Sequence, residues 1–181
     1  MLTENSKFNE SYSYVKQHSK DITDIVNGLV KRYSKELDEF VEVVQKYLQL
    51  VKEGTMEVYD TETLELQAIK LPTLLYFAGD GLEILGAESD VAEYRRKELY
   101  NQVISELSTE KYTIPDKKAE AEKRTEYEAM VTEIYDRAYK QLKLKIEHAT
   151  KLLESMKKVM EIRTAKISKG KGGDEYNLDR R

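Results

Sequence analysis

Two basic segments contain the residues best suited to chemistry in this sequence, and that chemistry is the binding of phosphate groups. The first segment, EYRRKELYNQ, places three consecutive cations between two tyrosines: Tyr94, Arg95, Arg96, Lys97 and Tyr100. Cationic side chains neutralise phosphates, and tyrosine rings stack on unpaired bases. The combination is typical of sequence-tolerant binding to single-stranded nucleic acid.

These three cations are predicted to lie on a helix, which limits how they can act together. Consecutive helical residues spread over about 200° of the helix circumference, so one face cannot hold Arg95, Arg96 and Lys97. The alternative interpretation is a charged outer face with the tyrosines packed inward. The tyrosines to test for base stacking are Tyr100, Tyr112 and Tyr139.

The second basic segment is SMKKVMEIRTAKISKGKGG, which holds six basic residues and one acid, Glu161. Arg163, Lys166 and Lys169 are expected near a helix C-terminus, where cations are favoured by the partial negative charge of the helix dipole. That interpretation does not explain the KGKGG run, which adds charge beyond the predicted helix end. A solvated helix end and a phosphate-binding arm both stay open.

The sequence predicts no catalytic residues, no metal ligands and no cofactor. Its histidines, His18 and His148, belong to no HExxH or ExxH pattern, and the chain has no cysteine. The run Gly79-Asp80-Gly81 lacks a phosphate-binding pattern and is expected to relieve packing or bend a helix. Four acids alternate with arginines, which is typical of a solvated helix face rather than a metal site: Glu126, Glu128, Glu133 and Asp136. We therefore expect a protein that is not an enzyme.

Two apolar stripes define the elements that must position these residues. The first stripe is Ile22, Val26, Leu29, Tyr33, Leu37, Phe40, Val44, Tyr47 and Val51. The second is Val131, Tyr135, Ala138, Leu142, Ile146, Ala149, Leu153, Met156 and Met160. Both average about 3.6 residues per step, the period of a straight α-helix. The predicted fold class is mainly all-α, with long antiparallel helices in an elongated hairpin or bundle.

Capping residues predict where the two long helices begin and end. Ser19 or Asp21 can cap the first helix, and Gly54 can end it. Pro115 is tolerated in a first helical turn, so the last helix is predicted to run from Pro115 to about Ser168.

The middle of the chain is expected to differ. Residues 54–70 contain β-favouring side chains, which predict a short β-hairpin or an extended segment around 55–70. Pro72 is expected to open a short apolar helix that ends at Gly86. Ser89 is expected to cap another helix, up to about Leu107. The domain prediction is a flexible N-terminus at 1–18, a single elongated helical domain at 19–168 and a flexible charged tail at 169–181.

Composition limits the classes of function. The chain has 181 residues with 30 basic and 34 acidic side chains, so nucleic-acid binding must come from local clusters. The absence of cysteine fits a reducing compartment, and no apolar run is long enough for a membrane span or a secretory signal. We therefore expect a cytoplasmic protein without a membrane partner. Fifty residues of amphipathic helix also predict self-association into a homo-oligomer.

Residues 95–166 resemble the UvsY-type recombination mediator family of tailed phages. The resemblance rests on a helix with a basic pair, RRKELYN, a polar connection, STEKYTIPDKK, and a long helix with late basic residues, YKQLKLKIEHATKLLESMKKVMEIR. Members of that family are small helical proteins that load a RecA-like recombinase onto single-stranded DNA coated by its binding protein.

The resemblance implies roles for particular residues. Arg95, Arg96, Lys97 and Tyr100 would bind DNA, and a phage-encoded protein would act in the host cytoplasm. Assembly would fall to five residues of the second stripe: Leu142, Ile146, Leu153, Met156 and Met160.

Two function hypotheses follow from the sequence. The first is a non-enzymatic, oligomeric accessory protein that binds single-stranded DNA and works with a recombinase or a single-strand-binding protein. The second is a helical protein-interaction module, such as a scaffold, an assembly factor or an inhibitor of a host enzyme, with no nucleic-acid binding. Net acidity and the lack of a dominant basic face favour the second.

Overall fold

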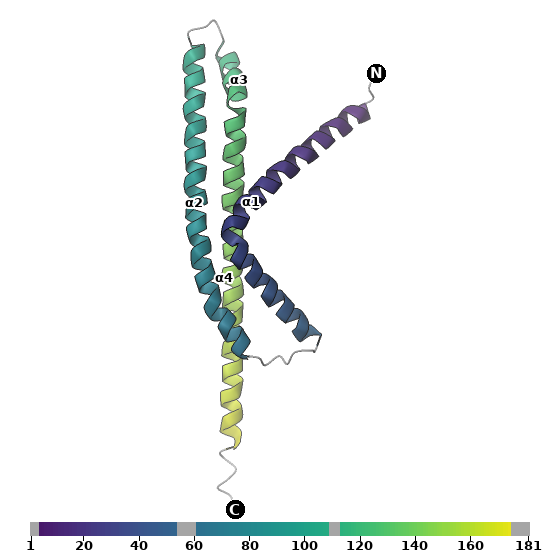
Figure 1. Ribbon diagram of the computed structural model, residues 1–181, viewed down its shortest axis with the longest axis vertical. Coiled ribbons are helices and arrows are strands. Elements are labelled where there is room, and N and C mark those ends of the chain that lie inside the picture. The colour runs from purple at the N-terminus through teal and green to yellow at the C-terminus, as the bar shows by residue number, and fades with distance from the viewer. Residues whose placement is uncertain (1–3, 54–60, 109–112, 175–181) are drawn as a thin grey trace, which may run out of the picture. The chain divides into compact units, whose positions relative to one another are not determined.

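The computed structural model of the protein describes residues 4–53, 61–108 and 113–174. Four helices follow one another in this part of the chain: α1 (Glu4–Lys52), α2 (Thr61–Leu107), α3 (Ile114–Arg124) and α4 (Glu126–Asp174) (Figure 1). These described residues contain no strand. The all-α class expected from the two apolar stripes is confirmed.

Helix α1 begins earlier than the capping residues predict. It starts at Glu4, so the described part of the segment predicted to be flexible is helical. Ser19 caps no helix end, because its hydroxyl donates to the carbonyl oxygen of Lys16 at 3.1 Å, and Thr23 donates in the same way to Ser19 at 2.7 Å. Hydroxyls make such bonds to the preceding turn inside a helix. Gly54 lies outside the described residues.

Helix α2 is one continuous helix, whereas the sequence predicts an extended segment followed by two shorter helices. Residues 61–70 are helical where the sequence predicts a hairpin or extended chain, and residues 54–60 lie outside the described part. Pro72 lies inside the helix, which also runs through Gly86 and Ser89. An interior proline costs about 3 kcal/mol, whereas each buried leucine contributes roughly 1.5–3 kcal/mol. Packing outweighs the proline here, because one side of α2 buries Leu71, Leu74, Ala78 and Leu85.

The segment predicted to be a single helix from Pro115 forms two helices, α3 and α4. Helix α3 begins at Ile114 with Pro115 in its first turn, and the Thr113 hydroxyl caps it by accepting a hydrogen bond from the amide of Asp116 at 3.4 Å. The helix start is therefore confirmed to within one residue. The interruption at Thr125 was not predicted, and α4 continues past Ser168 to Asp174.

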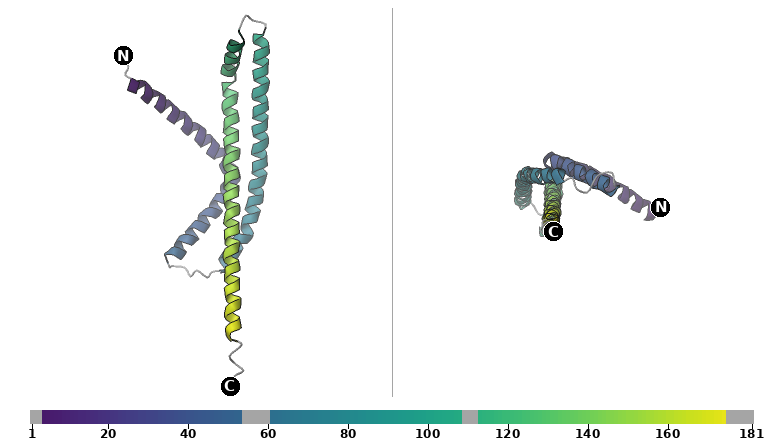
Figure 2. Two further views of the ribbon diagram at one scale, coloured as in Figure 1. Left: turned by 180° about the vertical axis from the view of Figure 1, so that it is seen from behind. Right: turned by 90° about the horizontal axis from the view of Figure 1, so that it is seen from below.

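Contacts divide the chain into two compact units, each built from parts of α1, α2 and α4. Unit 1 comprises Met1–Tyr33 with Asp80–Lys143, and unit 2 comprises Ser34–Gly79 with Leu144–Arg181. Within unit 1, α2 runs beside α3 and the first part of α4 in the opposite direction (Figures 1 and 2). The division of the chain at residues 18 and 168 stays a prediction.

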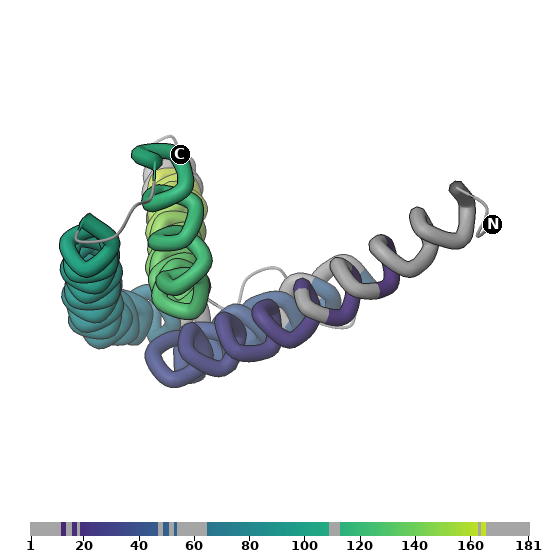
Figure 3. The backbone as a smooth tube through the Cα atoms, turned by 90° about the horizontal axis from the view of Figure 1, so that it is seen from above, coloured from purple at the N-terminus to yellow at the C-terminus, as the bar shows by residue number. Residues whose placement is uncertain are grey.

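Helix α1 packs against α2 and α4 within each unit, and Figure 3 shows the helices from above. In unit 1, Gln141 donates a side-chain hydrogen bond to Asn27 at 3.2 Å. In unit 2, one apolar cluster joins α1, α2 and α4: Leu37, Phe40, Val44, Leu71, Leu74, Ala78, Ala149, Leu153 and Met156. Members of both predicted stripes are in this core, which confirms their helical period; the side chains of Tyr47 and Val51 lie outside the described residues.

Gly81 allows α1 and α2 to approach closely within unit 1. A β-carbon at this position would lie 2.5 Å from Cβ and Cγ of Tyr33, far inside van der Waals contact. At Gly79, by contrast, an added β-carbon would meet nothing within 4 Å. The expectation that the Gly79-Asp80-Gly81 run relieves packing is confirmed for Gly81.

Candidate functional site

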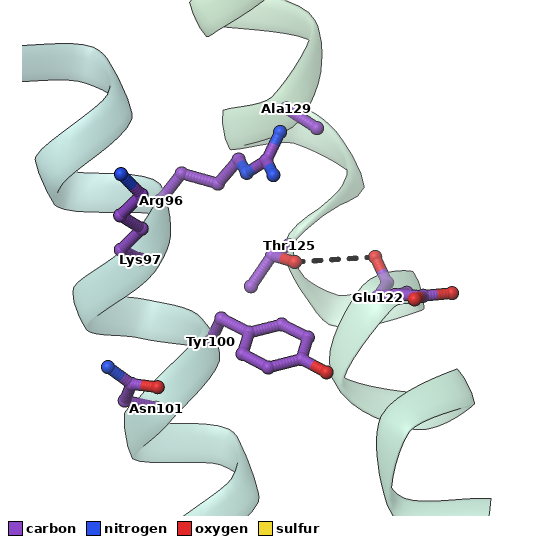
Figure 4. A pocket seen from close by; sticks show the side chains of 7 residues that line it. All are labelled: Arg96, Lys97, Tyr100, Asn101, Glu122, Thr125 and Ala129. Atoms are coloured by element: carbon purple, nitrogen blue, oxygen red, sulfur yellow. Dashed lines mark hydrogen bonds between the residues drawn. The ribbon is translucent and has the colours of Figure 1, made fainter. Parts of the chain in front are cut away.

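A hollow of about 670 Å³ lies in unit 1 between α2 and the junction of α3 with α4. Helix α2 contributes Arg96, Lys97, Tyr100 and Asn101 to its lining. The junction contributes Glu122, Thr125 and Ala129. In Figure 4 the Arg96 side chain reaches across toward Ala129, and the Tyr100 ring extends toward the junction. The hollow therefore combines two cations, an aromatic ring and an amide.

Thr125 forms the junction that closes the hollow on one side. Its amide donates to the carbonyl oxygens of Ala121 and Glu122 at 3.0 and 3.3 Å, and its hydroxyl donates to Ala121 at 2.8 Å. The residue is buried, with φ −106° and ψ 13°, outside the regular helical range. Helix α4 starts again at the next residue. The first amides of a helix have no intrahelical acceptor and give its N-terminus a partial positive charge.

The structure separates the three predicted cations. Arg95, Arg96 and Lys97 are all exposed, but only Arg96 and Lys97 line the hollow. The expected spread of consecutive helical residues accounts for this division. Tyr100 is half-buried and packs against the cluster of Val103, Leu107 and Ala121. One face of the Tyr100 side chain is thus structural, while the residue also lines the hollow.

Carboxylates compete for both cations. Lys97 forms an ion pair with Glu93 at 2.6 Å, and the hydrogen bond and charge of Lys97 hold the pKa of the Glu93 carboxyl below its usual range. Glu93 is therefore ionised at neutral pH and keeps Lys97 paired. A phosphate that enters the hollow competes with Glu93 for Lys97.

Arg96 also borders a second hollow of about 640 Å³ in unit 1, which is strongly acidic. Four carboxylates line it with Arg96: Glu93, Glu126, Glu133 and Asp136. Three of these acids are members of the series predicted to form a solvated face. Arg96 lines both hollows, so it lies between the acidic hollow and the hollow that Tyr100 lines.

The second basic group belongs to unit 2. Arg163, Lys166 and Lys169 are part of α4, and their side chains lie outside the described residues. Of the other tyrosines selected for stacking, Tyr112 is also outside the described part. Tyr139 is half-buried, with its ring near Gly86, where an added β-carbon would lie 3.4 Å from the ring. Tyr139 is thus placed for packing rather than stacking.

The residues predicted to mediate assembly are mostly covered within the single chain. Leu142, Leu153 and Met156 are buried, and Ile146 packs against the apolar cluster of unit 2. Met160 is half-buried. In unit 2, α1 and α2 cover this side of α4, so little of it is open to a partner.

Unit 2 contains a polar network that no sequence pattern predicted. Lys145 lies 2.5 Å from an Asp38 carboxylate oxygen, and the Ser34 hydroxyl donates to Asp38 at 2.8 Å. Lys145 also donates to Ser34 at 3.3 Å. The Ser34 residue is fully buried, so its hydroxyl cannot reach a substrate. The network ties α1 to α4, and Lys145 is more than 100 residues from both Ser34 and Asp38 in the chain, so the sequence carries no local signal of it.

The described residues contain no group of three or more His, Cys, Asp or Glu side chains placed to hold a metal ion. Within the same ranges, no helix is both long and apolar enough to cross a bilayer.

The chain matches no family model, no curated protein and no solved structure. The geometry of the hollow is therefore the basis for a functional proposal.

Proposed function

We propose that the protein binds single-stranded DNA, with a backbone phosphate at Arg96 and Lys97 and an unpaired base beside Tyr100. The observation that carries the proposal is the gathering of these three residues with Asn101 in one hollow of about 670 Å³. Arginine and lysine bind phosphate oxygens through charge-assisted hydrogen bonds. An aromatic ring offers stacking to any base, which suits binding without sequence preference.

The exposed aromatic residues of unit 1 support the same proposal. Tyr94 on α2 and Tyr127 on α4 expose 70% and 68% of their surface, far more than tyrosines that serve as core. Each lies two residues, or about 200° of helix, from Arg96 or Thr125, which places it on the far side of its helix from the hollow. A strand that leaves the hollow and passes around either helix would meet a further ring on which to stack.

Single substitutions in adjacent positions test the assignment. Arg96→Ala is expected to weaken binding of a labelled oligo-dT by about tenfold, the loss of one charge-assisted contact. Arg95→Ala is the matched control. It removes the same charge from the neighbouring residue, whose side chain does not line the hollow. Fluorescence anisotropy measures both. Equal losses for the two variants would show that charge alone, and not the hollow, determines binding.

Glu93→Gln is expected to strengthen binding. The substitution releases Lys97 from its ion pair and removes a negative charge beside Arg96. An exposed ion pair contributes little to stability, so the dissociation constant should fall by only about two- to fivefold. Glu98→Gln is the control, since Glu98 is exposed on the same helix and lines neither hollow. Unchanged affinity in Glu93→Gln would contradict the role of Lys97.

The resemblance to UvsY-type mediators supplies the finer part of the proposal. The protein would be a non-enzymatic, phage-encoded recombination mediator that acts as a homo-oligomer in the host cytoplasm. It would help to load a RecA-like recombinase onto DNA held by a single-strand-binding protein. Arg163, Lys166 and Lys169 would add phosphate contacts. A strand-exchange assay with a recombinase and a single-strand-binding protein tests this step, and no change in the lag before exchange would refute it.

A protein-interaction module is the second candidate, and one observation favours it. Helix α2 exposes large apolar side chains in unit 2: Leu66, Ile69, Tyr76 and Phe77. An exposed apolar face of this kind usually marks a contact with another protein. This candidate has no nucleic-acid binding, so it competes with the first; its exposed residues and the hollow belong to different units.

A further inference from the structure

The outer side of α2 in unit 2 is apolar and exposed. Four large side chains, which we call the α2 face, expose between 59% and 73% of their surface: Leu66, Ile69, Tyr76 and Phe77. Because an α-helix has about 3.6 residues per turn, they fall within about 100° of the helix circumference. Leu71, Leu74 and Ala78, which α2 buries in the core of unit 2, lie roughly on the opposite side. The α2 face therefore points away from the core that α2 shares with α1 and α4.

The spacing of this surface matches one strand of a coiled coil. Leu66, Ile69, Thr73 and Tyr76, all exposed, follow one another at steps of 3, 4 and 3 residues. These are the steps between the a and d positions of a heptad, whose seam meets a second helix that runs alongside. The rings of Tyr76 and Phe77 meet edge to face with centroids 5.7 Å apart, so this end of the seam is preordered. The occupant that fits the α2 face is a helix.

One charged side chain flanks the α2 face on each edge. Glu65 takes the heptad position g and Lys70 takes position e, when Leu66 is placed at position a. Both are exposed, and within the described residues neither forms an ion pair. In a parallel two-stranded coiled coil, position g of one helix lies beside position e of the other. Two parallel α2 helices would therefore place Glu65 of each copy beside Lys70 of the other.

The charges favour this orientation over the opposite one. In antiparallel helices each edge meets the same edge of the other copy, so the register that packs Leu66 against Tyr76 brings the two Lys70 side chains together. Like charges across a contact oppose association. Because the two flanking charges cancel, the face selects neither a basic nor an acidic partner. A second copy in the parallel orientation satisfies both charges and covers the apolar seam with an equal one.

We propose that two copies of the chain associate through their α2 faces, with the two α2 helices parallel and in register. The contact uses the same surface on both copies, so it closes as a dimer with two-fold symmetry. From Leu66 to Phe77 the helix spans only about 17 Å, a small contact for which we expect a dissociation constant of about 10–100 μM. The proposal does not rest on nucleic-acid binding, because the hollow belongs to unit 1 and the α2 face to unit 2.

Charge reversal on the two edges tests the pairing. Lys70→Glu makes both edges negative and Glu65→Lys makes both positive, so each variant alone should dimerise about tenfold more weakly than the wild type. An equimolar mixture of the two regains an ion pair on each edge and should form a 1:1 heterodimer about as tight as the wild-type dimer. Lys46→Glu is the control, since it reverses the same charge at an exposed position of α1 in unit 2. Far-ultraviolet circular dichroism should show unchanged helix content, because all three positions are exposed.

Single engineered thiols report the register, because the chain has no cysteine of its own. Leu66→Cys and Tyr76→Cys should each form a disulfide-linked dimer under mild oxidation, since equivalent a or d positions face each other in a parallel pair. In the antiparallel pair Leu66 lies about 15 Å along the helix from its own copy, beyond the reach of a disulfide. Only the mixture of the two variants would then cross-link. Ile25→Cys, an exposed position on α1 in unit 1, is the control.

Sedimentation velocity without DNA, together with non-reducing electrophoresis of the thiol variants, decides the outcome. A heterodimer from two weakened charge variants, with cross-links in each thiol variant alone, would support the proposal. Unchanged self-association of Lys70→Glu, or cross-linking in the thiol mixture only, would overturn it. A wild type that stays monomeric up to about 500 μM would also overturn it, and would leave the α2 face to a helix of a different protein.

Discussion

Leu142→Ala is expected to lower the free energy of unfolding by about 2–5 kcal/mol, the usual cost of truncating a fully buried leucine. Leu142 exposes none of its surface. Leu144→Ala is the matched control two residues away, since Leu144 is 53% exposed. It should change stability by about 0.5 kcal/mol or less. Urea denaturation followed by circular dichroism measures both.

The same experiment distinguishes a core residue from an assembly residue. If Leu142 packs within its own chain, the stability lost in Leu142→Ala should be the same at all protein concentrations. A residue in an oligomer interface would instead make the loss depend on concentration. A variant that is fully stable but no longer associates would contradict the burial of Leu142 in the single chain.

Gly81→Ala is expected to destabilise the protein by roughly 1–3 kcal/mol, the range for overpacking a close contact. The added methyl group would lie 2.5 Å from the near end of the Tyr33 side chain, which is fixed by the backbone of α1 and cannot swing away. The clash should outweigh the gain of roughly 1 kcal/mol that alanine brings to a helix interior. Thermal unfolding is a suitable measurement.

Gly79→Ala and Gly28→Ala are controls with the opposite sign. Nothing lies within 4 Å of a β-carbon at either position, so each should stabilise by about 0.5–1 kcal/mol through helix propensity alone. If Gly81→Ala stabilised the protein as much as Gly79→Ala, the close approach of α1 and α2 in unit 1 would be wrong.

The sequence predicts the helices well because amphipathic period is a local property. The steps between stripe residues such as Val26, Leu37 and Leu142 are sufficient to identify α1 and α4 and the side that each buries. The start of α3 was also predictable, because Pro115 and Asp116 act within their own turn. Local capping chemistry needs no knowledge of distant partners.

The helical state of residues 61–70, the break at Thr125 and the far side of the hollow depend on tertiary contacts, which the sequence does not reveal. Thr61 to Lys70 have β-favouring side chains, yet this segment continues into the helix that Leu71 and Leu74 anchor in the core of unit 2. Thr125 interrupts a pattern that reads as one helix, with φ −106° and ψ 13° outside the regular helical range. In the candidate site, Arg96, Lys97 and Tyr100 were predicted. Thr125 and Glu122 come from the opposite side of a hollow that only tertiary structure creates.

Salt-dependent binding of single-stranded DNA tests the central claim most directly. Fluorescence anisotropy with a labelled oligo-dT should show an affinity that falls by about sevenfold between roughly 50 and 200 mM salt, because two phosphate contacts in a single strand give a slope near −1.4. Additional contacts from Arg163, Lys166 and Lys169 would steepen it. Binding no tighter than about 1 mM at the lower salt concentration, or an affinity indifferent to salt, would contradict the account.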